Sequence, residues 1–149
     1  PLLKRRSRKL KKKMDSYSTK ILLAWGEAIS GNTKLRDWLI KNGFPELGLF
    51  CFALRNKDDA RNWLLENGHP HLMALINGAE GNMTAVAWLM KNNYELLGQM
   101  AMAADNDEAA MRWIHLNTSK EMFLIAQKIQ FVKNRIDADN EDAHRFSKD

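Results

Sequence analysis

Four tryptophans stand 25 residues apart in this chain, at Trp38, Trp63, Trp88 and Trp113. Each is followed by Leu or Ile and has an Asn four residues later, so that the segments read DWLIKNG, NWLLENG, AWLMKNN and RWIHLNT. Tryptophan is a rare residue, and four in register therefore indicate an internal repeat. A fixed period of this kind is typical of stacked units that cannot bury their apolar faces alone.

Each unit is predicted to form two short helices joined by turns. In the first helix of one unit, Ala60, Trp63 and Leu64 are spaced so that they share one helical face. An Asn-Gly pair then ends this helix, because both residues tolerate the left-handed backbone that helix ends commonly use. The second helix begins at Pro45 or Pro70 in two of the units, since proline fits a first helical turn.

A half-unit precedes the four tryptophan units. Residues 18–29 align with the second helix of a unit and carry Trp25 where the next unit has Phe50. The second helix of the last unit, residues 120–136, looks longer and carries Lys128, Lys133 and Arg135. Polar terminal helices of this kind are expected to cover the two open ends of a linear stack.

The chain is thus predicted to be all-α: a right-handed α–α superhelix (solenoid) of about four and a half helix-turn-helix repeats. With helices about 8–10 Å apart, the stack would be roughly 40 Å long. The scarcity of valine argues against a sheet. We expect the repeat domain to span residues 15–136, between a basic arm (residues 1–14) and an acidic tail (residues 137–149) that is frayed or disordered.

The arm holds the excess positive charge of the chain. Eight of the 23 basic residues lie in the first 13 positions, and the remaining 15 face 18 acidic residues. The body of the protein is therefore slightly acidic, and any preference for an anionic partner belongs to the arm. The basic residues of the arm are Lys4, Arg5, Arg6, Arg8, Lys9, Lys11, Lys12 and Lys13.

Three interpretations of this arm stand side by side. It is a solvated tail or a remnant of expression, or it neutralises the phosphates of a nucleic acid without reading sequence. In the third interpretation it lies on an anionic membrane, where each Lys or Arg contributes about 1 kcal/mol. The arm has no aromatic residue to stack on bases. An apolar run before Pro1 would make the arm the positive-inside flank of a membrane segment, with the repeat domain in the cytoplasm.

The helix pairs resemble those of armadillo, HEAT and tetratricopeptide arrays, over about 120 residues of this chain. Those arrays repeat roughly every 34 to 47 residues, so the unit here is shorter. The resemblance is one of architecture, and no functional residue is carried over from it. It implies that a protein segment binds on a concave helical face.

Two interpretations exist for each recurring residue type. The tryptophans either face a sugar or peptide ligand or are buried as cross-braces between layers. We expect burial, because Leu or Ile shares their helix face and buried aromatics dominate core energetics. The asparagines either bind a peptide backbone, as in armadillo arrays, or cap helices, and we expect capping because they precede predicted helix ends. They are Asn42, Asn67, Asn92 and Asn117.

Few residues remain as candidates for chemistry. His69 and His71 are expected in a surface turn, because Pro70 separates them and no third metal ligand is evident. Cys51 stands at a small-residue core position, where a thiol is buried and inert. The sequence has no evident nucleophile–base pair and no phosphate-binding glycine loop. We therefore expect no catalytic, metal-binding or cofactor-binding residues and no enzyme activity.

Together these observations favour a protein–protein interaction scaffold that offers a helical-repeat surface to a protein or peptide. The alternative is a binder of nucleic acid or of an anionic membrane surface through residues 4–13. A single cysteine excludes an intrachain disulfide and fits a reducing compartment. We expect a cytoplasmic protein, membrane-associated if the arm lies on a bilayer.

Deleting residues 1–13 is expected to abolish binding to duplex DNA and to vesicles that contain phosphatidylserine, because the phosphate-neutralising charges lie there. Co-sedimentation and mobility-shift titrations at low and high salt measure this loss. Capture of a protein partner by the repeat domain is expected to persist. If the intact chain binds neither DNA nor vesicles, the arm-driven alternative fails.

Overall fold

In the computed structural model, Met14 and residues 16–148 are described, and their regular structure is helical, without a β-strand. The predicted all-α repeat fold is therefore confirmed. The helices are α2 (Thr19–Ile29), α3 (Thr33–Lys41), α4 (Pro45–Leu54), α5 (Asp58–Glu66), α6 (Pro70–Ala79), α7 (Met83–Lys91), α8 (Glu95–Ala104), α9 (Glu108–Asn117) and α10 (Lys120–Lys148).

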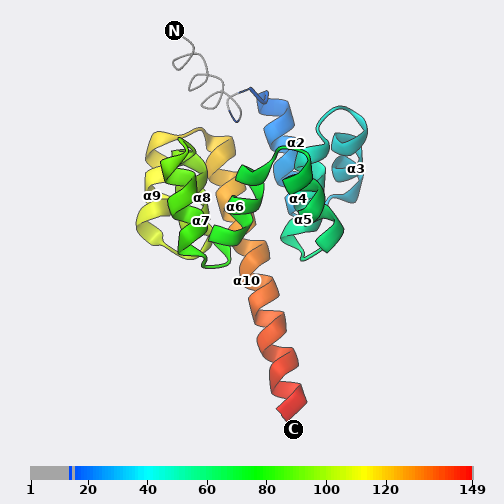
Figure 1. Ribbon diagram of the computed structural model, residues 1–149, viewed down its shortest axis with the longest axis vertical. Coiled ribbons are helices and arrows are strands. Elements are labelled where there is room, and N and C mark those ends of the chain that lie inside the picture. Colours follow the sequence, from blue (N-terminus) through cyan, green and yellow to red (C-terminus); the bar gives the residue numbers. More distant parts are fainter. Residues whose placement is uncertain (1–13, 15, 149) are drawn as a thin grey trace.

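These helices form an inner and an outer layer (Figure 1). The second helices of successive units, α2, α4, α6, α8 and α10, form the inner layer, and α3, α5, α7 and α9 form the outer one. Composition separates them: α4 contains a single charged residue, Glu46, whereas α3 has one fully buried residue, Leu39, and charged residues around it. A helix that is apolar almost all round must be buried, and a helix with one apolar stripe can cover it.

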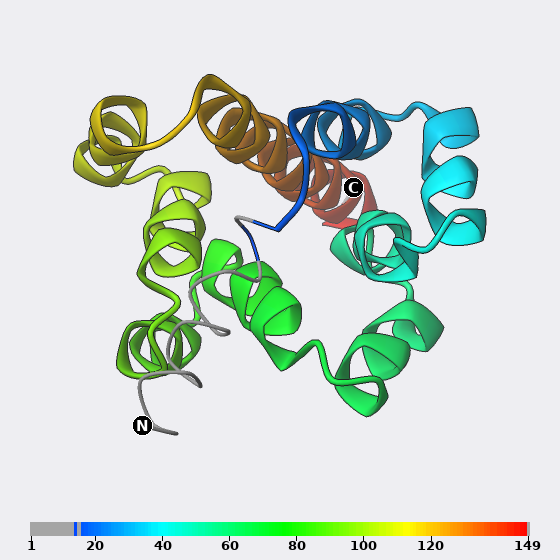
Figure 2. The ribbon, with the colours of Figure 1, turned by 90° about the horizontal axis from the view of Figure 1, so that it is seen from above.

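The inner layer closes on itself. α10 packs against α2, from the other end of the chain, and also against α8 and α9 (Figure 2). Gly26 of α2 lies at this contact, where a Cβ would be 3.3 Å from Cδ of Lys128 and 3.7 Å from Cγ1 of Ile125. The expectation of a linear stack with two open ends is therefore wrong. The two ends of the stack pack on each other, which removes the facing apolar side chains of α2 and α10 from water.

Three tiers of side chains fill the resulting ring. Each tier takes one residue from every inner helix, and successive tiers are three and then four residues apart along each helix. Their largest pair, Trp25 and Phe50, meets edge to face with ring centroids 5.1 Å apart. The apolar positions of the second helices thus form the core. The tiers are Leu22, Leu47, Leu72, Leu97 and Met122; Trp25, Phe50, Leu75, Met100 and Ile125; and Ile29, Leu54, Ala79, Ala104 and Ile129.

The recurring asparagines cap helix ends, as predicted. Their side-chain amides donate to the backbone carbonyl of the tryptophan four residues earlier, at 2.7–2.9 Å. The residues that follow in three units, Gly43, Gly68 and Asn93, have φ of +93°, +83° and +66°. These values are the left-handed conformation that glycine and asparagine adopt most readily, so the chain turns there into the inner helix.

The tryptophans of the repeat, in contrast, are not buried cross-braces. Trp38 and Trp88 are 45% and 39% exposed, while Trp63 and Trp113 are half-buried. The residue after each of them is fully buried instead, because the short outer helix directs that position inward. The indole lies about 100° further round the helix. In two units it stacks on the aromatic residue six positions later: Trp63 on His69 (5.7 Å) and Trp88 on Tyr94 (6.0 Å).

Basic side chains join neighbouring units at the C-terminal ends of the inner helices. Arg55 donates through Nη2 to the carbonyl oxygen of Ile29 in the preceding inner helix at 2.8 Å. Arg61 donates through Nε to the carbonyl oxygen of Ala53 at 3.0 Å and pairs with Glu80 at 2.7 Å. Cations are favourable at these ends because the last helical carbonyls have no intrahelical partner and carry the negative end of the helix dipole.

α10 continues as a helix through residues 137–148, so the predicted frayed tail is wrong over that range. One turn before this range, Lys133 is 6% exposed and pairs with Asp105 at 3.5 Å and with Asp137 at 3.6 Å. Lys133 and Asp137 are one turn apart, a spacing at which an ion pair supports the helix. Figure 1 shows the last turns of α10 projecting away from the ring.

Replacing Trp25 by Ala is expected to lower the free energy of unfolding by about 3–5 kcal/mol, because its ring is fully buried in the middle tier. Trp38→Ala removes a ring that is 45% exposed and should cost about 1 kcal/mol. Urea denaturation followed by circular dichroism measures both. Equal losses would mean that the exposed indole braces the fold after all.

Candidate functional site

The basic arm lies outside the described residues. All eight of its Lys and Arg residues fall within residues 1–13, so their contact with nucleic acid or membrane stays a prediction. Met14, which we assigned to the arm, is described and is 6% exposed within the hydrophobic core. The core therefore begins before residue 15.

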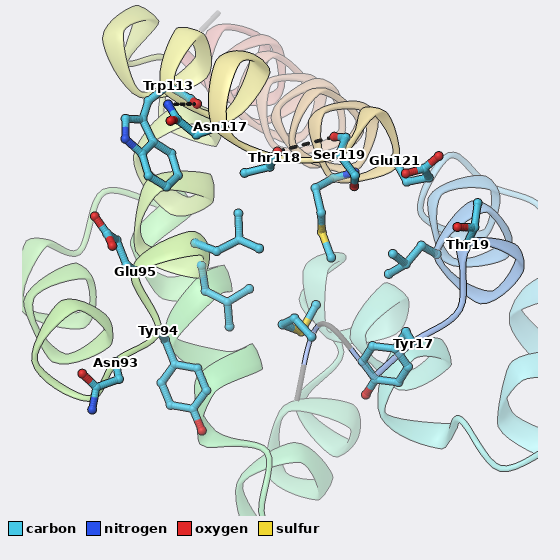
Figure 3. A pocket seen from close by; sticks show the side chains of 15 residues that line it. Tyr17, Thr19, Asn93, Tyr94, Glu95, Trp113, Asn117, Thr118, Ser119 and Glu121 are labelled. Carbon is cyan, nitrogen blue, oxygen red and sulfur yellow. Dashed lines mark hydrogen bonds between the residues drawn. The ribbon is translucent and has the colours of Figure 1, made fainter. Parts of the chain in front are cut away.

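A cavity of about 620 Å³ opens at the N-terminal end of the ring (Figure 3), and we call it the mouth. It lies where α2, α8 and α10 begin, and Leu22, Leu97 and Met122 of the first tier line its inner part. Trp113 and Tyr94 lie on one side of the mouth and Tyr17 on the other, as Figure 3 shows. The mouth is thus the place where the ring interior is accessible.

The segment before α2 crosses part of the mouth and is fastened to α4. The Tyr17 hydroxyl donates to Oε1 of Glu46 at 2.6 Å, and its ring lies 6.0 Å from that of Phe44. Burial and the hydrogen bond to Glu46 raise the pKa of Tyr17 well above its usual range. Tyr17 therefore stays protonated and keeps donating to the carboxylate, which itself is only 9% exposed.

Some polar groups around the mouth serve the helix ends. Ser119 accepts a hydrogen bond from the Met122 amide at 3.2 Å, and the Thr118 hydroxyl donates to the Ile114 carbonyl at 2.7 Å. Glu95 and Glu121 lie on different sides of the cavity (Figure 3). The mouth is therefore a partly apolar recess whose two carboxylates are apart from each other.

The two histidines belong to a chain of aromatic rings. His71 stacks on Tyr94 with centroids 4.9 Å apart, His69 stacks on Trp63, and the two imidazoles are 5.9 Å apart. His71 is 3% exposed, so the expectation that both lie in a surface turn is wrong for this residue. The turn between α5 and α6 directs it inward because α6 already begins at Pro70. Among the described residues no group of three or more His, Cys, Asp or Glu side chains is arranged to hold a metal ion.

Cys51 is buried, as predicted. Its side chain is 1% exposed, and its thiol donates to the Leu47 carbonyl at 3.5 Å. Burial raises the pKa of the thiol to about 12. The reactive thiolate is therefore scarce at neutral pH, which is typical of a structural cysteine.

A second surface lies on the outside, where α10 meets α2. Five of the large apolar side chains that are exposed stand on these two helices and on their outer neighbours α3 and α9, and we call this group the seam. Shallow grooves flank it, one of about 500 Å³ between α9 and α10 and one of about 570 Å³ between α2 and α3. The seam residues are Leu23 (47% exposed), Trp38 (45%), Leu116 (78%), Leu124 (42%) and Phe131 (68%).

Sequence reasoning did not identify the seam, although the repeat register contains a signal for it. Leu116 stands where the three preceding units have Lys41, Glu66 and Lys91. An apolar residue thus replaces a charged one in the unit next to the closure. That exchange indicates an exposed apolar surface only because α2 and α10 pack together in the folded protein.

Comparisons of the chain with protein-family models, with curated proteins and with solved structures found no match. What is established is the architecture, an all-helical repeat. None of the helices in the part of the chain that the structure describes has the length and apolar composition needed to cross a bilayer.

Tyr17→Phe is expected to lower the free energy of unfolding by about 1–3 kcal/mol at neutral pH, because the nearly buried Glu46 loses its donor. The raised pKa of Tyr17 means that its contribution is fully present below the unfolded pKa near 10 and is lost as the pH rises further. The difference between wild type and variant should therefore shrink by about 1.4 kcal/mol per pH unit above pH 10. Urea titrations from about pH 8 to about pH 11 measure it. A difference that is constant over this range would contradict the assignment.

Proposed function

We propose that the protein is a non-enzymatic scaffold that binds a protein partner through the seam. The observation that carries this proposal is the gathering of exposed apolar side chains around the contact that closes the ring. Apolar side chains exposed together and bordered by polar residues are typical of interaction sites, whereas single exposed ones need no explanation.

Closure of the ring supports an outer rather than a concave binding surface. The interior is filled by the three tiers, so it offers no groove of the kind that open helical arrays use. Among the described surfaces, the seam combines apolar area with two grooves. The mouth supports the proposal less well, because its polar groups cap helices and Met14 and Tyr17 partly line it.

The apolar side chains of the seam are also not part of the three tiers that form the core of the ring. Phe131 is 68% exposed and Leu124 is 42% exposed, whereas Ile125 and Ile129 of the same helix are buried in the tiers of the ring. Exposed leucine and phenylalanine on a domain surface favour association with other proteins.

A double substitution, Leu124→Ser with Phe131→Ser, is expected to abolish capture of the physiological partner while the fold is kept. In-cell cross-linking followed by mass spectrometry, run in parallel on wild type and variant, measures the set of captured proteins. The matched control is Leu65→Ser with Met83→Ser, because these residues are 54% and 61% exposed on α5 and α7, away from the seam. Capture of the same proteins in the same yield by wild type and seam variant would contradict the proposal.

A further inference from the structure

The outer layer is incomplete at one place. α3 packs on α2 and α4, α5 on α4 and α6, α7 on α6 and α8, and α9 on α8 and α10. Among the described helices none lies in this way across α10 and α2, the pair that closes the ring (Figure 2). We call this position the fifth seat.

The repeat register directs one residue of α2 toward the fifth seat. Two of its counterparts, Gly48 and Gly98, face the outer helix that precedes their own helix. A Cβ on Gly48 would lie 2.8 Å from the carbonyl oxygen of Arg36 in α3, and one on Gly98 would lie 2.7 Å from Cε of Met90 in α7. The counterpart in α6 is Met73, which is 5% exposed. In α2 no described outer helix precedes, and the same position is Leu23, which is 47% exposed. Leu23 is thus an exposed apolar residue at a position that described outer helices cover elsewhere.

The register directs α10 toward the same seat. Gly78 of α6 faces the outer helix that follows it, since a Cβ there would lie 3.0 Å from Cγ2 of Val86 in α7. The residue at this position in α10 is Lys128. Leu124 and Phe131 lie one turn before and one turn after Lys128, on the same helix face. Leu23, Leu124 and Phe131 therefore form an apolar floor for the seat, contributed by both helices of the closing pair.

The border of the seat is basic. Lys20 lies one turn before Leu23, and Lys120 and Arg135 lie one turn before Leu124 and one turn after Phe131, all three exposed. The acidic residue on this side of α2, Glu27, already pairs with Lys128 at 3.5 Å. Opposite charge at the border of an apolar site steers a partner and rejects partners of like charge.

We infer that the fifth seat binds an acidic amphipathic helix of a partner protein, which completes the outer layer. The inference rests on the proposed function and specifies its partner. The outer helices of the chain define the apolar pattern that fits such a seat: Ala or Leu, followed four residues later by Leu or Ile. The pairs are Leu35 and Leu39, Ala60 and Leu64, Ala85 and Leu89, and Ala110 and Ile114.

One outer helix carries this pattern in acidic form. α5 begins with Asp58 and Asp59 and ends with Glu66, and it buries Ala60 and Leu64. α7 has the same apolar pattern but no acidic residue and ends with a lysine. Because Lys128 is larger than its counterpart Gly78, a ligand helix would lie less deep in the fifth seat than α7 lies on α6. A helix bound in this way is expected to dissociate readily.

A peptide of residues 58–67, held helical by a staple on its exposed side, is the probe. A peptide of residues 83–92, stapled in the same way, is the matched basic control. In a heteronuclear NMR titration of the full chain, the acidic peptide is expected to shift the amide signals of Leu23, Leu124 and Phe131. Leu23→Ser with Leu124→Ser should weaken its binding by about tenfold or more, as loss of central apolar contacts does in other interfaces. Met83→Ser, at an exposed residue outside the seat, should leave the affinity unchanged.

Four results would overturn the inference. The first is that the acidic peptide shifts signals outside the seat and not those of the seat. The second is that the double substitution leaves its affinity unchanged, and the third is that the basic peptide binds equally well. The fourth is a concentration-dependent dimer of the protein that the double substitution dissociates, because a second copy would then be the occupant. If the peptide does not bind but partner capture still depends on Leu124 and Phe131, the inference of an acidic helix is wrong and the proposed binding through the seam stands. Failure of both overturns the proposed function as well.

Discussion

The contact between α2 and α10 is the constraint on which the rest of this structure depends. Gly26 of α2 lies at this contact, next to Lys128 and Ile125 of α10. Because α2 and α10, the first and last described helices, pack together there, the five inner helices surround the apolar side chains of the three tiers. Short helices of this kind are not stable alone, and closure lets each of them bury its inner face on two neighbours.

Closure also decides where function can lie. An open helical array presents a concave face, but the tiers around Trp25 and Phe50 fill the interior here. Accessible surfaces remain at the mouth and outside the ring. At the mouth, Met14 and Tyr17 line part of the opening, and Thr118 is engaged in a hydrogen bond at the end of α9. The outer side of the α2–α10 pair differs from the rest of the surface because no described helix covers it.

Departures from the repeat are more informative than the repeat itself. Where an outer helix precedes, this position of the inner helix is covered, as at Gly48, Met73 and Gly98. In α2, which no described outer helix precedes, the equivalent residue is Leu23, and it is 47% exposed. Leu116 likewise replaces residues that are charged in the other units. Each departure is a local change of one side chain, and together they mark one side of the molecule.

Much of the local structure could be predicted from the sequence, because it depends on neighbours within one unit. The helix starts at Pro45 and Pro70 and the caps at Asn42 and Asn67 follow from backbone chemistry alone. The burial of Cys51 follows from its place among small core residues. The orientation of the tryptophans could not be predicted in this way. A 25-residue period identifies which residues are equivalent, but it does not say which of two adjacent apolar residues points inward.

The sequence by itself determined that the chain is an array of helix pairs, where each pair begins and ends, and which positions are equivalent. Only the tertiary structure decided that the array closes, that the residue after each tryptophan and not the indole is fully buried, and that His71 points inward. The physical reason is that periodicity fixes contacts between successive units, whereas the curvature that brings α2 to α10 is the sum of small rotations over the whole array. No single segment encodes that sum. The seam therefore follows only from the tertiary structure, in which α2 and α10 lie side by side (Figure 2).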